Sequence, residues 1–160
     1  MKYLLMAGWL IVILLVSCNS GGETVYKEYH KMENVVWKRF DYQVFEVSGM
    51  EPDQPYDIYF EFRHTPFYPF DYFFFTLAVI QPDGNFRAQD YKFYLKKSGV
   101  WVSDCLGDYC DFSYPLKKRF YFNQKGTYKF EFENRMPKNP LIGVVEVGLV
   151  IKKSPEKPAE

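Results

Sequence analysis

The sequence contains few of the residues from which active sites are usually built. Histidine occurs only twice in 160 residues, as His30 and His64. No serine lies in a nucleophile elbow, and no glycine-rich loop is present that could hold phosphate groups. We expect both histidines to be exposed or partly packed side chains rather than catalytic bases. The sequence therefore predicts a protein that is not an enzyme.

Charge of one sign is not concentrated anywhere in the chain either. Lysine and arginine together number 20, and aspartate and glutamate also number 20. The basic cluster at residues 117–119 would be divided between two faces by the alternation of a strand. Asp104, Asp108 and Asp111 are close in sequence but lack the spacing of a calcium loop. These patterns favour a protein with no nucleic-acid partner, no metal and no soluble cofactor.

Cysteine is scarce as well, but the position of Cys18 is informative. Lys2 precedes the apolar residues 4–16, a run typical of a signal peptide and too short to span a bilayer comfortably. A leucine lies three residues before Cys18 and a serine directly before it, which is the pattern of a bacterial lipobox. The alternative is an ordinary secretory signal with an incidental cysteine. The lipobox predicts cleavage before Cys18 and attachment of a diacylglycerol and an acyl chain such as palmitate, which together anchor a protein to a membrane.

These signals divide the chain into four parts. We expect a lipoprotein signal peptide over residues 1–17, a lipidated tether over 18–24, one folded domain over 25–153 and a flexible polar tail over 154–160. A domain of this length can bury a sizeable core without metals or many disulfides. Asn19 follows the cysteine, and no acidic tract comes directly after it. The sequence thus shows neither the aspartate of an inner-membrane retention signal nor the acidic tract of a surface-export signal. We therefore expect a cell-envelope protein that is anchored in the outer membrane and faces the periplasm.

Aromatic residues are what the chain has in excess. They make up 21% of the sequence, with 16 Phe and 14 Tyr, and such residues fit the pleated, half-buried surface of a sheet. Apolar and polar residues alternate in several segments, which indicates strands. The expected strands span residues 25–32, 40–47, 57–63, 72–80, 91–96, 116–122, 127–133 and 144–152. Their number and spacing predict an all-β fold, an antiparallel two-sheet β-sandwich, with a closed or partly open β-barrel as the alternative.

Two turns and one core follow from the same pattern. Residues 82–85 and 123–126 combine turn formers with a glycine, so we expect a hairpin at each. The inward positions of the strands define the predicted core, which comprises Phe60, Phe62, Phe75, Leu77, Phe93, Phe130, Phe132, Val147 and Leu149.

The remaining cysteines, Cys105 and Cys110, form one even pair in the mature chain. The compartment beyond the inner membrane is oxidising, and Gly107 and Asp108 between the cysteines favour a turn. A short disulfide is the leading interpretation, with free thiols as the alternative.

Trp101, Tyr109, Phe112 and Tyr114 suggest a second function. Exposed aromatic rings on one face could form a platform for sugars, so a glycan-binding module of the envelope is the alternative function. The competing interpretation is that most of these rings pack in the core.

Several segments, taken in order, resemble a known family. They are the lipobox, residues 68–70 before an apolar strand, residues 82–84, Trp101 followed by 106–108 and Asp111, then 125–128, 141–143 and 147–151. In this order and spacing the sequence is similar to the gliding motility lipoprotein H (GldH) family of Bacteroidota.

The resemblance implies a non-enzymatic envelope lipoprotein. It implies a component or assembly factor of the gliding machinery, linked to secretion across the outer membrane, with protein partners in that apparatus. The segment most similar to the family after the lipobox is Leu106, Gly107 and Asp108 with Asp111. We expect these residues in a loop that contacts a protein partner, and the alternative is that they only make a turn.

Overall fold

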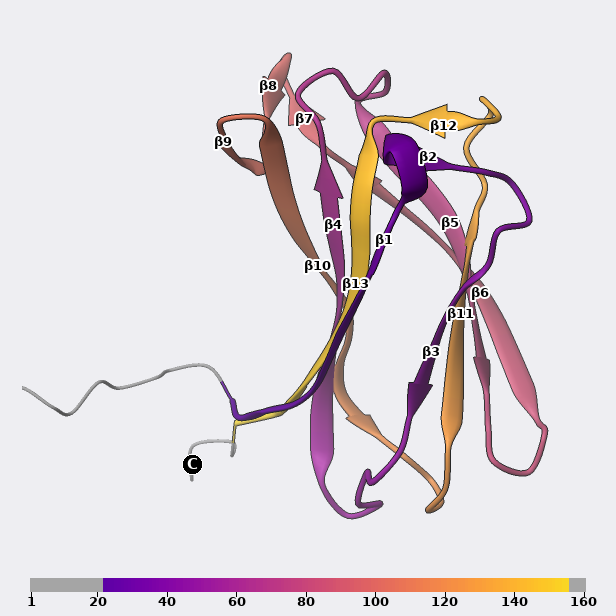
Figure 1. Ribbon diagram of the computed structural model, residues 1–160. Coiled ribbons are helices and arrows are strands. Elements are labelled where there is room, and N and C mark those ends of the chain that lie inside the picture. Colours follow the sequence, from indigo (N-terminus) through magenta and orange to yellow (C-terminus); the bar gives the residue numbers. More distant parts are fainter. Residues whose placement is uncertain (1–21, 156–160) are drawn as a thin grey trace, which may run out of the picture.

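The computed structural model describes residues 22–155, which form two antiparallel sheets packed face to face (Figure 1). The five-stranded sheet has the order β1-β13-β4-β10-β9, and the four-stranded sheet has the order β3-β11-β5-β6. The sheets remain open at their edges. The predicted β-sandwich is therefore confirmed over the alternative of a closed barrel.

The strands of the two sheets have the following bounds. The five-stranded sheet contains β1 (Thr24–Lys31), β4 (Pro55–His64), β9 (Asp104–Leu106), β10 (Tyr109–Tyr121) and β13 (Val144–Lys153). The four-stranded sheet contains β3 (Gln43–Val47), β5 (Tyr72–Ile80), β6 (Phe86–Tyr94) and β11 (Tyr128–Asn134).

Short elements complete the fold. They are the 3-10 turn η2 (Glu33–Val35), the paired strands β2 (Val36–Trp37) and β12 (Leu141–Ile142), and the hairpin of β7 (Lys96–Lys97) and β8 (Val100–Trp101). Within residues 22–155, no helix is long and apolar enough to cross a membrane.

Aromatic side chains from both sheets fill the space between them. Phe60 of β4 packs within 4.7 Å of Phe75 and 5.0 Å of Phe132, measured between ring centroids. All nine residues of the predicted core are buried. Alternate residues of each strand point inward and bring these rings together. The many aromatic residues of the sequence therefore form much of the core.

Of the two predicted hairpins, one is confirmed and one is wrong. Residues 81–85 join β5 to β6, and Gln81 N–H donates to the carbonyl of Asn85 at 2.7 Å. Residues 123–126 instead connect β10 of one sheet to β11 of the other. The turn residues reverse the chain as predicted, but Phe122 before the turn is fully buried between the sheets. The connection therefore crosses from one sheet to the other instead of joining two neighbouring strands as a hairpin.

Both ends of the described chain lie at one end of the sandwich (Figure 1). Lys153 N–H donates to the carbonyl of Glu23 at 2.8 Å, and their side chains form an ion pair at 2.6 Å. Ser154, expected in a flexible tail, is buried and donates to Asp57 at 2.6 Å. The predicted signal peptide, Cys18 and residues 156–160 lie outside the described residues.

Candidate functional site

The β9–β10 hairpin lies at the end of the sandwich opposite the termini, which we call the far end (Figure 1). The far end also holds the β4–β5 loop and the β7–β8 hairpin. Cys105 of β9 and Cys110 of β10 face each other in register and form a disulfide, with their Cα atoms 3.9 Å apart. The predicted bond is therefore present, and it ties β9 to β10 within the hairpin.

The predicted contact residues occupy different positions around this hairpin. Leu106 is 87% exposed at its tip, and Gly107 has a φ of +62°. Glycine tolerates this left-handed conformation, so it allows the tight turn between β9 and β10. Asp108 is exposed beside it. Asp111, expected in the loop, lies instead within β10 on the outer face of the five-stranded sheet.

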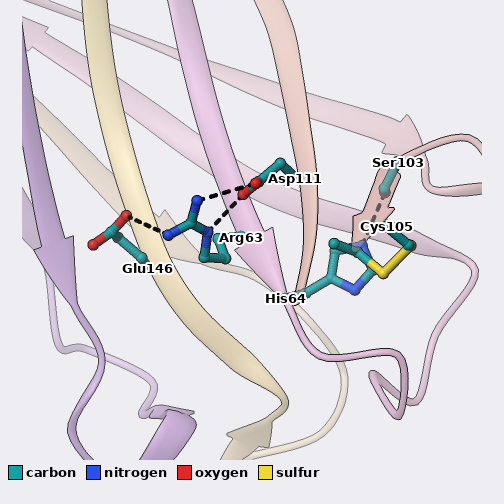
Figure 2. Close-up of polar contacts among 7 residues, drawn as sticks. Arg63, His64, Ser103, Cys105, Asp111 and Glu146 are labelled. Atoms are coloured by element: carbon teal, nitrogen blue, oxygen red, sulfur yellow. Dashed lines mark hydrogen bonds and ion pairs between the residues drawn. A yellow bond between two sulfur atoms is a disulfide. The ribbon is translucent and has the colours of Figure 1, made fainter. Parts of the chain in front are cut away.

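Arg63 of β4 forms an ion pair with Asp111 on this outer face. Its Nε and one Nη donate to the two carboxylate oxygens of Asp111 at 2.6 and 3.0 Å, and Glu146 of β13 lies 3.8 Å away on the other side (Figure 2). The hydrogen bonds that Arg63 donates to the Asp111 carboxylate raise the pKa of Arg63. Because the pair is partly exposed, it contributes only about 0.2–1 kcal/mol to stability. The pair therefore fixes the orientation of the two charged groups and adds little to the stability of the fold.

These charged groups line a concavity of about 420 Å³ on the sheet's outer face. Lys27 and Tyr29 of β1 form its opposite side, and the guanidinium of Arg63 lies 5.8 Å from the ring of Tyr109. The concavity carries both signs of charge, with Glu61 beside Arg63. Such a mixed polar surface is typical of the rim of a protein interface.

His64, the next residue of β4, points the other way and is buried. The sequence predicts an exposed or partly packed His64, and this prediction is wrong because the side chain is fully buried. Its Nδ1–H donates to the carbonyl of Thr65 at 2.8 Å, so Nε2 accepts from the hydroxyl of Ser103 at 2.9 Å (Figure 2). Burial lowers the pKa of His64, which favours this neutral form.

The His64 contacts join the segments of the far end. Trp101 packs 4.6 Å from the imidazole, and Ser103 leads directly into β9. His64 therefore positions the chain that enters the hairpin.

Large apolar side chains are exposed at the far end. Leu106 is accompanied by Phe67 of the β4–β5 loop, which is 88% exposed, and by Val100 and Val102. Exposed apolar groups held on a rigid, crosslinked scaffold are a feature of interaction surfaces.

The aromatic rings considered for glycan binding do not form a platform. Phe112 and Tyr114 stack on the buried ring of Phe93, at 4.9 and 5.0 Å between centroids, and Trp101 packs against the core. Tyr109 is the exposed member of the set. Among residues 22–155 no group of three or more His, Cys, Asp or Glu side chains could hold a metal ion.

A sequence model of the family described as GldH lipoprotein matches residues 24–151. The chain belongs to the GldH lipoprotein family. A protein of Christiangramia forsetii described as "Gliding motility lipoprotein GldH homolog" is 25% identical over 151 residues, which are 89% of this chain and 91% of that protein. The resemblance inferred from the sequence is therefore confirmed.

The GldH match begins at the first residue of β1 and ends inside β13. Both sheets, the far end and the Arg63 concavity thus belong to the family domain. Membership of the GldH family makes the protein a gliding-motility lipoprotein, which is a lipid-anchored protein of the cell envelope.

Proposed function

We propose that this protein is a non-enzymatic component or assembly factor of the gliding machinery linked to outer-membrane secretion. The far end, with Leu106, Gly107, Asp108 and Asp111, is its contact with another protein of that apparatus. Family membership supports the gliding role. The observation that carries the contact is the exposed Leu106 at the tip of a hairpin fixed by a disulfide.

The position of the hairpin supports this assignment. The chain enters the sandwich from residue 22 at one end, and the hairpin lies at the other (Figure 1). A lipid on Cys18 places the entry end nearest the membrane. The hairpin then projects away from the bilayer, where a partner can reach it. We place the anchor in the outer membrane with the domain in the periplasm.

Substitution of Leu106 tests the contact. Leu106→Asp changes an exposed side chain, so the free energy of unfolding stays within about 0.5 kcal/mol of wild type. The charge opposes burial in an apolar interface. We expect the variant to be anchored and folded, but to lose its partner in affinity purification from native membranes and to reduce spreading of the cells.

Phe86→Asp is the matched control. Phe86 is 69% exposed and lies at the beginning of β6, at the opposite end of the molecule. The Phe86→Asp variant carries the same kind of change away from the proposed contact. It should purify with the same partners as the wild-type protein. If Leu106→Asp retains its partners and spreading as fully as Phe86→Asp does, the proposed contact is wrong.

A further inference from the structure

A second cavity lies away from the far end, between the two sheets. This cleft has a volume of about 320 Å³ and opens between β6 and β10. Its walls are mostly apolar side chains from both sheets, among them Ile58, Leu77, Val79, Leu116 and Phe130. Arg87, Gln89 and Lys117 also line it, and their side chains are exposed to solvent. The cleft therefore combines an apolar interior with a polar mouth.

The cleft is closed on the side toward the far end. There, Phe112 and Tyr114 of β10 stack on Phe93 of β6 and seal the two sheets together. Farther along the same strands, the Lys117 ammonium donates to the side-chain oxygen of Gln89 at 3.1 Å. This contact bridges β6 and β10 at the mouth, so a ligand that enters there must pass beside it, and the aromatic seal stops it from running the full length of the strands.

The shape of β10 keeps this part of the sandwich open. Its pairing with β4 shifts register between Pro115 and Lys117 and again between Lys117 and Phe120. Such bulges bend a strand and redirect its side chains. The buried carboxylate of Asp57 accepts from Arg119 N–H at 3.0 Å and from the Lys118 ammonium at 2.9 Å, which holds the bent segment in place. The opening is therefore a fixed feature of the fold.

The mouth carries two positive charges, and the one polar contact given above for Lys117 is with the neutral amide of Gln89. Arg87 and Lys117 line the cleft, and no acidic residue lines it. Neither cation forms an ion pair with another residue in the range 22–155. A ligand with an anionic head and an apolar body would match the mouth and the interior together.

We propose that this cleft binds a fatty acid, with its acyl chain between the sheets and its carboxylate at Arg87 and Lys117. Ligand pockets span roughly 300–1,000 Å³, so a cleft at the small end of this range suits one acyl chain rather than a diacyl lipid. Because the aromatic seal closes the cleft, the shape favours a compact amphiphile over an added strand of a partner protein.

The position of the cleft relative to the anchor agrees with a ligand of this kind. Thr24 of β1 pairs with Lys152 of β13, which pairs with Asp57 of β4, and the adjacent Tyr56 pairs with Phe120 beside the cleft. The cleft thus lies at the level of the sheet where the chain enters from residue 22. In a lipid-anchored protein this end is nearest the bilayer, which is the source of fatty acids.

Photocrosslinking tests the proposal on the full-length lipidated protein. The protein is placed in nanodiscs of phosphatidylcholine and exposed to hexadecanoic acid that carries a diazirine in its chain. We expect mass spectrometry to locate the crosslinks in residues 77–91 and 116–130. Excess hexadecanoate should remove them, whereas hexadecyltrimethylammonium, which has the same chain and a cationic head, should not.

Removal of the two cations supplies the second readout. The double variant Arg87→Gln, Lys117→Gln should require roughly 10-fold more hexadecanoic acid probe for equal labelling, as expected for loss of two partly exposed ion pairs. The matched control is Lys92→Gln, Lys129→Gln, because these exposed lysines lie on strands of the four-stranded sheet outside the cleft lining. It should label as wild type does.

Three results would overturn the proposal. The first is labelling outside the cleft, and the second is labelling that the double variant leaves unchanged. The third is equal competition by the cationic amphiphile. Wild-type protein that the fatty-acid probe does not label would overturn the proposal as well.

Discussion

Asp57 shows how one residue can depart from the pattern of its strand. It alternates with the inward residues of β4 and is expected on the solvated face, yet its side chain is buried. Ser154, Lys118 and the backbone N–H of Arg119 all donate to its carboxylate. Arg119 has a φ of +51°, an unfavourable value for a residue with a side chain. Asp57 thus stabilises a strained bulge and fixes the end of the chain after β13.

The charge of Asp57 makes stability depend on pH. Burial acts to raise its pKa, but the hydrogen bonds from Ser154, Arg119 and Lys118 outweigh burial and lower the pKa below its ordinary value. A lowered pKa in the folded state means that the stabilisation is present at neutral pH. It is lost as the pH falls below about 4, where the carboxyl of the unfolded chain takes up a proton.

We predict that Asp57→Asn lowers the free energy of unfolding by about 2 kcal/mol at pH 7, since it weakens charged hydrogen bonds at a buried site. The difference from wild type should shrink as urea titrations are repeated from pH 6 down to pH 3. Glu51→Gln is the control, because Glu51 forms an exposed pair with Lys125. If the Asp57 variant differs from wild type no more than this control does, the role given to Asp57 is wrong.

At the scale of elements, alternation predicted where strands occur but not which strands pair. β5 matches its expected span of 72–80, because both of its faces carry apolar residues. β10 is longer than expected and begins at Tyr109, since its first half alternates exposed with partly buried aromatic positions. Turn residues predicted both chain reversals. They could not show that residues 123–126 cross between sheets, because that depends on where Phe122 packs.

For the candidate site too, the sequence predicted the local features but not the contacts between strands that are distant in sequence. The turn at Gly107 and the cysteine pair follow from local sequence, since five residue steps must fold back to join the thiols. Arg63 and Glu146 were missed as partners of Asp111. Their contact depends on the register of β4 with β10 and with β13, and these strands are far apart in sequence. The pairing of His64 with Ser103 across the fold was missed for the same reason.

The disulfide is the feature that holds the β9–β10 hairpin, and its removal gives the prediction at this scale. The double variant Cys105→Ala, Cys110→Ala should lose about 2 kcal/mol of stability, as the chain-entropy model gives for so short a loop. Amide hydrogen exchange should increase at residues 104–109 and remain unchanged in β5. Wild-type protein kept under a reductant is the control and should behave as the variant does. Unchanged exchange at the hairpin in both samples would contradict the role of the bond.

At the scale of the whole molecule, the fold separates two ends. The chain enters beside its own C-terminal strand, and the exposed apolar residues Phe67 and Leu106 lie at the far end. The sandwich between them separates the proposed contact surface from the end at which the chain enters. This arrangement suits a protein that presents a binding surface away from its lipid anchor.

The anchor is tested at Cys18. Cys18→Ala removes the thiol that the lipid requires, so we expect the variant to incorporate no palmitate analogue and to leave the membrane fraction. The domain should remain folded, because its described strands begin at Thr24. Wild-type protein labelled in parallel is the control. Equal labelling of both proteins would show that the lipid is not attached at this cysteine.

Site-specific photocrosslinking in intact cells tests the proposed contact most directly. A photoreactive amino acid replaces Leu106 at the far end or, in a matched strain, Phe86 at the opposite end. Both positions are exposed, so both proteins should fold and reach the membrane. We predict that the probe at 106 crosslinks to a discrete envelope protein of the gliding or secretion apparatus and that the probe at 86 does not. Equal crosslinking from both positions, or a discrete product from 86 alone, would contradict the account.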